Sequence, residues 1–433
     1  MSVRRILVIG SGGREHALAW RLSRDPERPQ VRVAPGNPGI AARFDCLPID
    51  GANPEAVLAA ARAYAIELIV VGPEVPLAAG LADVLESAGI PTFGPSGEAA
   101  RLESSKWFAK QVMSEARVPT ARAEAFDDVH AAREALPRFG PPWVIKADGL
   151  AAGKGVRVTG DRREAEDFLA DCFTRRRFGA GGSRVVLEEF LAGEEASVMA
   201  VCDGNRALLL PAARDYKRAF DSNRGPNTGG MGALAPHPGV GPALESEIER
   251  RIVSPLLGRM RERGTPFRGL LYCGLMLTGT GPRVIEFNVR FGDPEAQVVL
   301  PLLEGSLSEL LLGASRGALD AGAVSRAPGA AVAIALTDAG YPDSTAGAGT
   351  IVGLEALESD RNVEIFHAAT APSPGGWRVT GGRAAYVIGR GADLSEARAA
   401  AYRAVDRLSG TGWRARRDIA ADVGASNATT RGA

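Results

Sequence analysis

The stretch RVIEFNVRFGDPE, residues 283–295, carries the most chemical information in the chain. Its first half alternates apolar and polar residues, which predicts a strand with one buried face. Because successive strand side chains point to opposite faces, Glu286, Asn288 and Arg290 are expected on the same side. A carboxylate and an amide oxygen suit a magnesium ion that bridges phosphates, and Arg290 offers a bidentate fork for a carboxylate or phosphoryl group. A solvent-exposed strand face would show the same alternation. The neighbouring motifs must therefore decide between a ligand-binding face and a solvent-exposed one.

A glycine-rich segment, VIKADGLAAGKGV, precedes this strand at residues 144–156. It predicts a strand, a turn and a returning strand that could close over a triphosphate, with Lys146 and Lys154 neutralising the charge. It is not a Walker A loop, because Gly155 occupies the Ser/Thr position and a strand follows where a helix should. Taken alone, such a loop is more often an ordinary hairpin.

The next segment along the chain, VVLEEFLAGEEASV, covers residues 185–198. A strand here ends in adjacent carboxylates, and the chain then turns into another strand. Backbone groups at such a strand end can read an adenine edge, and a following carboxylate can hold ribose hydroxyls. The alternative interpretation is a solvated acidic turn.

A long polar loop lies between the segment at 185–198 and the strand at 283–295. It contains RDYKR, residues 214–218, and GPNTGGMGA, residues 225–233. Loops of this length without structure of their own are usually functional or disordered. Asp215 and Lys217 would supply one charge of each sign there.

Residues 4–103 alternate between strand and helix patterns, which predicts a parallel sheet with right-handed crossovers. Strands are expected at 6–9, 31–33, 68–71 and 91–93, and helices at 15–23, 54–64 and 77–88. Ligands of such sheets bind at the carboxyl ends of the strands. The segments GSGGREH (10–16), APGNPG (34–39), VGPE (71–74) and FGPS (93–96) all fall there.

The turn GSGGREH could place backbone N–H groups against a phosphate at a helix start. Glu15 stands where a dinucleotide fingerprint needs its third glycine, which argues against a nicotinamide oxidoreductase. Arg14 and Glu15 point instead to a phosphorylated sugar with hydroxyls. A tight turn with surface charges is the alternative.

Composition limits the function further. Lys plus Arg and Asp plus Glu both number 51 among 433 residues, so charge gives no reason to expect a nucleic-acid or membrane partner. The four cysteines are scattered without a CxxC pair, which favours a reducing cytoplasm over a zinc site or disulfide framework. The N-terminal MSVRRILVIG is interpreted as the start of a buried strand rather than a signal peptide.

We expect an α/β protein with an N-terminal substrate-binding domain at 1–103 and a central region at 104–326. The central region should comprise a small lid lobe at about 122–191 and a larger lobe at about 192–326. A helix at 104–116 should lead into it. A C-terminal domain should follow at 327–433, with no further fused enzyme domain.

Eight segments taken in order closely resemble the phosphoribosylamine–glycine ligases, a family of the ATP-grasp superfamily. They are GGREHAL, APGNPG, VGPEVPL, FGPS, KADGLAAGKGV, EEFLAGEEAS, GPNTGGMGA and VIEFNVRFGDPE, and together they span essentially the whole chain. The resemblance implies an ATP-grasp fold with an N-terminal parallel α/β domain and a small C-terminal α+β domain. It also implies ligation of glycine to 5-phosphoribosylamine through glycyl phosphate, with ATP and Mg²⁺ (or Mn²⁺), in purine biosynthesis. A transient contact with the enzyme that supplies phosphoribosylamine would follow.

The resemblance also assigns residues. For ATP it implies Lys106, Lys146, Gly149, Gly153, Lys154, Gly155, Glu188, Phe190, Leu191 and Glu195. For the metal it implies Glu286 and Asn288. For the substrates it implies Gly12, Gly13, Arg14, Glu15, Gly72, Pro73, Glu74, Asp215, Arg290, Gly292 and Asp293, with Arg290, Asp215 and Lys146 as the catalytic set.

Three departures from the family pattern are visible. Residues 268–282 contain no carboxylate, although related enzymes often place a metal ligand on that strand. Ala369 and Ala420 stand where the family commonly has glycine. Two alternatives remain at this point, namely another ATP-grasp carboxylate–amine ligase or carboxylase, and a non-enzymatic nucleotide sensor.

Overall fold

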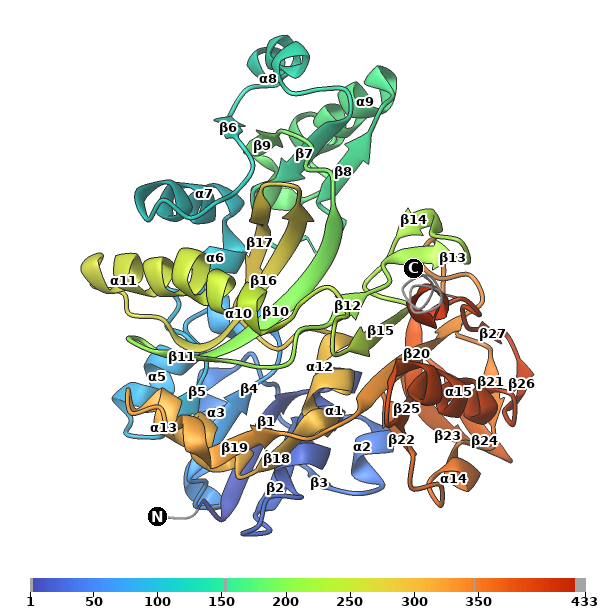
Figure 1. Cartoon of the computed structure of the whole chain (residues 1–433). Coiled ribbons are helices and arrows are strands. Elements are labelled where there is room, and N and C mark those ends of the chain that lie inside the picture. The colour runs from blue at the N-terminus through green and yellow to red at the C-terminus, as the bar shows by residue number, and fades with distance from the viewer. Residues whose placement is uncertain (1–2, 152–153, 346, 425–433) are drawn as a thin grey trace, which may run out of the picture.

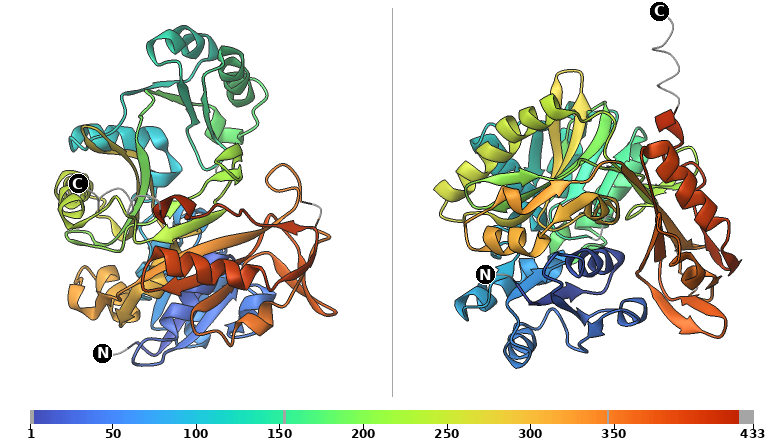
Figure 2. Two further views of the ribbon diagram at one scale, coloured as in Figure 1. Left: turned by 45° about the vertical axis from the view of Figure 1, so that its right-hand side comes forward. Right: turned by 60° about the horizontal axis from the view of Figure 1, so that its bottom comes forward.

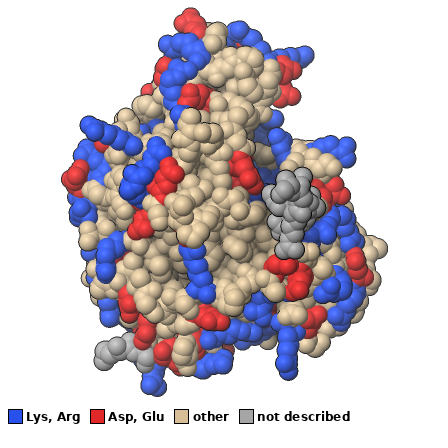
Figure 3. Space-filling view, viewed as in Figure 1, with Lys and Arg blue, Asp and Glu red and all other residues tan. Residues whose placement is uncertain are grey.

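The computed structural model describes residues 3–151, 154–345 and 347–424. The N-terminal sheet lies at the base of the view in Figure 1, a small lobe stands at the top, and the C-terminal region lies at the lower right. Among the helices of these residues, none is long and apolar enough to cross a membrane. On the face shown in Figure 3, cationic and anionic side chains are interspersed.

The N-terminal sheet is parallel, with strand order β3-β2-β1-β4-β5, as predicted. Its strands are β1 (Arg5–Gly10), β2 (Gln30–Pro35), β3 (Asp45–Cys46), β4 (Leu68–Val71) and β5 (Thr92–Phe93). Its helices are α1 (Gly13–Leu22), α2 (Pro38–Ala41), α3 (Pro54–Ala63), α4 (Glu74–Ala78) and α5 (Leu81–Ser87). The strand order reverses between β1 and β4, so their carboxyl ends form the switch point at which such sheets bind ligands.

One predicted helix is divided in the structure, and another begins two residues later than expected. The single helix expected over 77–88 is wrong, because Gly80 adopts a left-handed conformation (φ +82°) between α4 and α5. The helix expected over 104–116 is confirmed as α7 (Lys106–Glu115), and a separate short helix, α6 (Arg101–Ser104), precedes it. Extended backbone at Ser105 separates them, and its hydroxyl accepts a hydrogen bond from Phe108 N, which caps α7.

The small lobe is a four-stranded antiparallel sheet with order β6-β9-β7-β8 and its own apolar core. Its strands are β6 (Ala123–Phe126), β7 (Trp143–Ala147), β8 (Val156–Thr159) and β9 (Val185–Glu188). The helices α8 (Val129–Ala135) and α9 (Arg162–Phe173) and the short turns η1 (Leu136–Arg138) and η2 (Gly179–Gly182) complete it.

The large lobe is built on the antiparallel sheet β11-β10-β16-β17. Its strands are β10 (Glu194–Asp203), β11 (Ala207–Leu209), β16 (Arg268–Thr278) and β17 (Gly281–Asn288). Around it lie α10 (Pro242–Ile248), η3 (Glu249–Val253), α11 (Ser254–Glu262), α12 (Glu295–Val299), η4 (Leu300–Leu302), α13 (Leu307–Ser315) and η5 (Ala321–Ala323). A two-stranded ribbon pairs β18 (Leu303–Gly305) with β19 (Val324–Arg326).

The C-terminal sheet includes strands from the polar loop of the central region. β12 (Arg214–Asp215) and β15 (Gly232–Ala235) continue the order into β20 (Ala330–Asp338), β25 (Arg383–Gly391) and β22 (Val363–His367), and β27 (Trp413–Arg414) pairs with β20. The helix α15 (Leu394–Val405) packs on β25 and β20, as the views in Figure 2 show. The same region contains β21 (Thr350–Val352), β23 (Thr370–Ser373), β24 (Gly376–Val379), β26 (Ser409–Thr411), α14 (Leu354–Leu357) and η6 (Ala421–Gly424). A hairpin of β13 (Arg218–Phe220) and β14 (Arg224–Asn227) projects beside it.

Candidate active site

Glu286 and Asn288 lie near the end of β17, at the edge of the large-lobe sheet. Burial alone would raise the pKa of the Glu286 carboxyl, but Lys217, Lys146 and Lys106 outweigh it and hold the pKa below its usual range. An anion among three ammonium groups indicates a place where phosphates and a cation can meet. Among the residues that the structure describes, no cluster of three His, Cys, Asp or Glu side chains could hold a metal. Glu286 and Asn288 therefore offer two hard oxygen donors, and phosphates and water would have to complete the shell.

Lys146 on β7 and Glu188 on β9 form an ion pair within the small sheet, and Lys146 also reaches β17. Lys146 Nζ lies 3.0 Å from Glu188 Oε1 and donates a hydrogen bond to Ile285 O at 2.8 Å. The other carboxylate oxygen of Glu188 lies 3.0 Å from Lys110 Nζ. Burial lowers the pKa of Lys110 to about 8, although Glu188 opposes the shift. The Glu188 carboxylate, which the resemblance assigns to the nucleoside, is thus engaged by two ammonium groups in this structure.

Lys106 connects α7 to the glycine-rich turn after β7. Its ammonium donates to Gly149 O at 2.9 Å, and burial lowers its pKa despite the nearby Glu286. Asp148, in the same turn, accepts hydrogen bonds from Ser105 Oγ and Trp107 N, both at 3.0 Å. The turn is therefore anchored to the start of α7. Of its predicted residues, Lys154 is exposed, and Gly153 lies outside the described residues.

The connection from β9 to β10 carries the other predicted nucleotide residues. Phe190 is 46% exposed, Leu191 is half-buried, and the Glu195 carboxylate lies 2.7 Å from Lys217 Nζ. Burial lowers the pKa of Lys217, yet Glu195 and the other neighbouring anions outweigh burial, and the pKa stands well above its usual value. This pair joins the strand end to the polar loop of residues 214–233.

Asp215 is enclosed at the base of that loop, and its Oδ1 has no hydrogen-bond partner. Burial, and then the Glu295 carboxylate, raise the pKa of Asp215 well above its usual value. Glu295 is itself satisfied, because Tyr272 and Ser197 hydroxyls donate to its Oε1 at 2.8 and 2.9 Å. A buried acceptor without a donor is costly, so this position suits a cationic ligand.

Arg290 joins the large lobe to the N-terminal sheet. Its guanidinium lies 3.0 Å from Glu103 Oε1 and 3.3 Å from Glu74 Oε2, and it donates to Asn288 Oδ1 at 3.3 Å. Glu103 is held by a hydrogen bond from Val289 N at 2.7 Å. Burial disfavours the charge of Arg290, but Glu103 and Glu74 raise its pKa overall. Glu74 at the β4 end thus reaches the strand that carries the candidate metal ligands.

The β1–α1 turn is folded around the Glu15 carboxylate. Glu15 accepts hydrogen bonds from Gly12 N and Arg14 Nε, both at 2.6 Å, which caps α1. A side chain at Gly72, next to Pro73, would place its Cβ 2.2 Å from Glu15 Oε1. A side chain at Gly13 would meet the Tyr386 ring at 2.5 Å. Packing alone therefore requires glycine at positions 13 and 72, whether or not a ligand binds there.

Asp293 is engaged by three residues. Gln297 Nε2 and Tyr386 OH each donate to its Oδ1 at 2.8 Å, and Arg383 lies 3.2 Å from its Oδ2. Burial would raise the pKa of Asp293, but Arg383 and Arg14 lower it overall. Gly292 beside it leaves room for Glu295, since a Cβ there would lie 2.5 Å from Glu295 Oε2.

The structure thus gathers three lysines, Glu286, Asn288, Arg290 and Glu74 at one junction of the lobes. Sequence reasoning missed several side chains that support this junction, namely Lys110, Glu103, Ser197, Tyr272, Glu295 and Arg383. Lys110 could have been found from its spacing of four residues from Lys106 on one helix face. Glu295 belongs to the quoted RFGDPE segment, whereas nothing local marks the others.

The fold and the site define an ATP-grasp protein. The Phosphoribosylglycinamide synthetase N domain matches residues 4–103, the ATP-grasp (A) domain matches 104–296, and the C domain matches 331–422. The chain belongs to this family.

Known proteins support the assignment. Phosphoribosylamine–glycine ligase of Phenylobacterium zucineum is 46% identical over 420 residues, covering 95% of this chain and 99% of that protein. The crystal structure of phosphoribosylamine–glycine ligase from Thermotoga maritima superposes with a TM-score of 0.83 at 35% identity, covering 96% of this chain and 100% of that one. A biotin carboxylase domain of Hydrogenobacter thermophilus 2-oxoglutarate carboxylase, in complex with MgADP and bicarbonate, has a TM-score of 0.71 at 17% identity, covering 96% and 92%. This last likeness concerns the fold alone.

Proposed function

We propose that the chain ligates glycine to 5-phosphoribosylamine at the expense of ATP, giving glycinamide ribonucleotide, ADP and phosphate in purine biosynthesis. Family membership over nearly the full length supports this reaction. The structural observation that carries the proposal is the environment of Glu286, an ionised carboxylate among Lys217, Lys146 and Lys106. Arg290 follows the same strand by two residues. A ligase that activates a carboxylate with ATP needs this combination of charges.

ATP is proposed to lie between the small lobe and β17. Lys106, Lys146 and the turn of residues 149–155 would hold the phosphates, and the β9–β10 connection with Glu188, Phe190, Leu191 and Glu195 would surround the nucleoside. We also propose a division into three parts: an N-terminal domain at 1–103, a central region at 104–326 that includes the small lid lobe, and a C-terminal domain at 327–433.

A divalent cation fits the donors present, and Mg²⁺ is the proposed metal, with Mn²⁺ as a substitute. Glu286 and Asn288 would hold it, and both are hard oxygen donors on one strand. When bound, the ion would neutralise phosphate charge during phosphoryl transfer. The protein supplies few metal ligands here, so metal affinity should depend strongly on the nucleotide.

The substrates are proposed to meet beside Arg290. The start of α1, with Gly12, Gly13, Arg14 and Glu15, and the β4 end, with Gly72, Pro73 and Glu74, would hold the phosphoribosyl group. Arg290 would face the glycine carboxylate, with Asp215 near its ammonium and Gly292 and Asp293 shaping the adjacent turn. The unpartnered Asp215 Oδ1 supports the ammonium assignment.

The reaction then proceeds in two balanced steps. A glycine carboxylate oxygen attacks the γ-phosphorus of ATP, ADP leaves, and glycyl phosphate forms. The amine of phosphoribosylamine attacks the acyl carbon, the C–O bond to phosphate breaks, and the proton that the amine loses as the amide forms passes to the departing phosphate or to solvent. No protein nucleophile is required, because the lysines and Arg290 act by positioning the reactants and neutralising charge.

Two further proposals complete the picture. The substrates are small molecules in a cytoplasmic pathway, and the unstable phosphoribosylamine would favour a transient contact with the enzyme that makes it. No observation favours a carboxylase or a nucleotide sensor, because the carboxylase likeness is limited to the fold and both candidate metal ligands are present.

Oxygen transfer tests the proposed chemistry. With glycine labelled with ¹⁸O in both carboxylate oxygens, one label should appear in inorganic phosphate for each glycinamide ribonucleotide formed. Unlabelled phosphate alongside product formation would exclude glycyl phosphate and overturn the mechanism. A reaction run in ¹⁸O water with unlabelled glycine serves as the matched control, and its phosphate should stay unlabelled.

A further inference from the structure

The glycine-rich part of the polar loop is held by the C-terminal region. We call residues 228–230 the glycine strap. Gly229 N donates a hydrogen bond to Tyr341 OH at 3.0 Å, and Gly229 O accepts one from an Arg383 guanidinium nitrogen. Both backbone polar groups of Gly229 are therefore bound by side chains that lie more than a hundred residues further along the chain.

The Arg383 guanidinium also holds the turn that follows β17, the strand with the proposed metal ligands Glu286 and Asn288. It donates to Asp293 O at 3.0 Å and lies 3.2 Å from Asp293 Oδ2. Burial disfavours its charge, yet Asp293 and its other neighbours raise its pKa overall, so Arg383 stays cationic. The planar guanidinium of Arg383 thus links the glycine strap to the RFGDPE turn. A lysine ammonium could not make both sets of contacts in this geometry.

The glycine strap lies directly against Asp215. Gly230 has φ +113°, and a Cβ there would lie 2.7 Å from the unpartnered Asp215 Oδ1 and 2.4 Å from Pro294 Cδ. On its other side, Thr228 donates to Lys217 O through its amide at 2.7 Å and its hydroxyl at 2.8 Å. The position of the strap therefore sets the space around Asp215 and Lys217.

We infer that Arg383 and Tyr341 are positioning residues through which the C-terminal region completes the glycine-binding part of the site. They touch neither the nucleotide lysines nor Glu286 in any hydrogen bond or ion pair of the described residues. Their loss should therefore affect the use of glycine and leave nucleotide binding intact. The inference rests on the proposed function, because its main measurement is kcat/KM for glycine.

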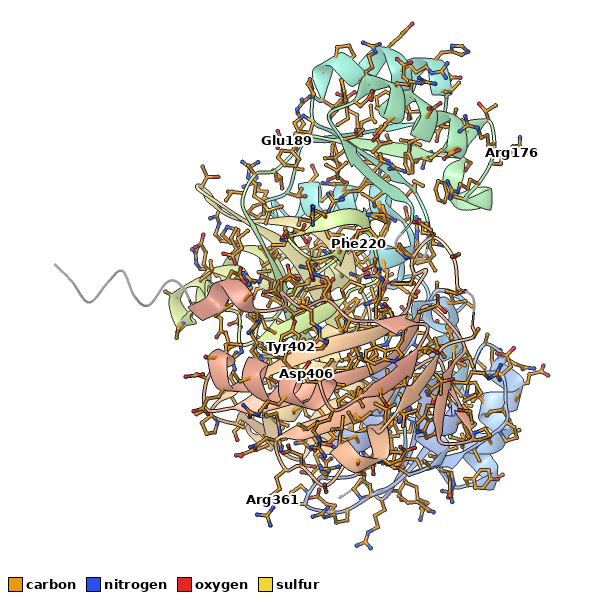
Figure 4. The ribbon with its side chains drawn as sticks, turned by 90° about the vertical axis from the view of Figure 1, so that its right-hand side faces the viewer. Arg176, Glu189, Phe220, Arg361, Tyr402 and Asp406 are labelled. Carbon is orange, nitrogen blue, oxygen red and sulfur yellow. The ribbon has the colours of Figure 1, made fainter. Side chains whose placement is uncertain are left out.

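The decisive variants are Arg383→Met, Arg383→Lys and Tyr341→Phe. Arg390→Met is the matched control, because Arg390 lies on the same strand β25 but donates to Arg361 O. Figure 4 shows Arg361 at the bottom of the molecule and Phe220, on the β13–β14 hairpin that leads into the strap, well above it. The loss of the fork should lower kcat/KM for glycine by about tenfold to a hundredfold in Arg383→Met, because small misplacements of reactants are expensive.

The remaining results follow from the same contacts. Arg383→Lys should recover only part of the loss, and Tyr341→Phe should lower kcat/KM for glycine by about threefold to tenfold, while the MgADP dissociation constant measured by calorimetry stays within about twofold. Amide hydrogen exchange at residues 228–230 should quicken in these variants and not in Arg390→Met.

Several results would overturn the inference. Unchanged glycine kinetics and strap exchange in both Tyr341→Phe and Arg383→Met would do so, as would a parallel loss of MgADP affinity. If Arg383→Met fails to fold, Tyr341→Phe alone decides the matter. A parent protein that releases no glycine-dependent ADP would refute the proposed function instead, and strap exchange would still test the positioning role.

Discussion

The carboxylate of Glu188 on β9 lies 3.0 Å from the ammonium of Lys146 on the neighbouring strand β7, and both side chains are buried. Since Lys110 takes the other oxygen of Glu188, one anion compensates two cations there. Removal of this charge should leave both lysines unpaired in the protein interior. The Glu286 carboxylate also acts on Lys146, and the phosphates of bound ATP would add further compensation.

Glu188→Gln should therefore lower the free energy of unfolding by about 3–5 kcal/mol, the usual cost of breaking a buried ion pair. Denaturant unfolding measures this loss. Glu189→Gln is the control, because the Glu189 side chain is 35% exposed and its ion pair with Arg283 should be worth less than about 1 kcal/mol. Equal losses in the two variants would contradict the interpretation of Glu188.

Glu286→Gln should lower kcat/KM by about a hundredfold or more, because it removes an ionised donor from a site of phosphoryl transfer. The concentration of Mg²⁺ that gives half-maximal activity should rise as well, which a metal titration of the rate measures. Glu249→Gln, an exposed substitution on η3, should leave both quantities unchanged. An unchanged metal requirement in Glu286→Gln would exclude Glu286 as a metal donor.

The fold was largely predictable because apolar alternation and strand–helix order act locally. The parallel N-terminal sheet follows from short buried runs such as residues 6–9, and the strand over β17 follows from its period-two pattern. The helix predicted over 77–88 failed at Gly80, since a single glycine ends a helix only when the following turn needs a left-handed residue. No pattern in the sequence shows that β12 and β15 join the C-terminal sheet.

The site was predictable where its residues share a strand or a loop. Glu286 and Asn288 lie on β17 and Arg290 follows it by two residues, so their spacing in the sequence alone groups them. Their partners come from far along the chain, as with Arg383 and Asp293, which are 90 residues apart. The sequence therefore indicated which side chains carry charge, but it could not show that Glu188 faces two lysines.

His367 makes the joint between the N-terminal and C-terminal regions sensitive to acid. Burial lowers its pKa from 6.5 to about 4, and its backbone N–H donates to His16 Nδ1 at 2.9 Å. The unfolded chain binds more protons than the folded protein between these two values, so the free energy of unfolding should fall as pH drops from 6.5 to 4. The shift corresponds to about 3 kcal/mol from His367.

His367→Asn should flatten this part of the pH dependence, which denaturant unfolding at several pH values measures. His130→Asn is the matched control, because His130 is exposed on α8 and should leave the slope unchanged. An unaltered slope in His367→Asn would show that other groups carry the acid sensitivity.

Ala420 adopts φ +58°, a left-handed conformation that disfavours any side chain with a Cβ. Ala420→Gly should therefore raise the free energy of unfolding by about 0.5–1 kcal/mol, since relief of strain exceeds the added entropy of the unfolded chain. Ala421→Gly, outside the left-handed region, should not stabilise the protein. Greater stability of the second variant than of the first would contradict the strain argument.

Release of ADP by the purified protein tests the central claim most directly. The mixture contains ATP, Mg²⁺, glycine and freshly generated phosphoribosylamine, and each is omitted in turn. We predict that full ADP release requires all four and that glycinamide ribonucleotide appears in equal amount. ADP release that needs neither glycine nor phosphoribosylamine, or that needs a different acid or amine, would contradict the proposed reaction.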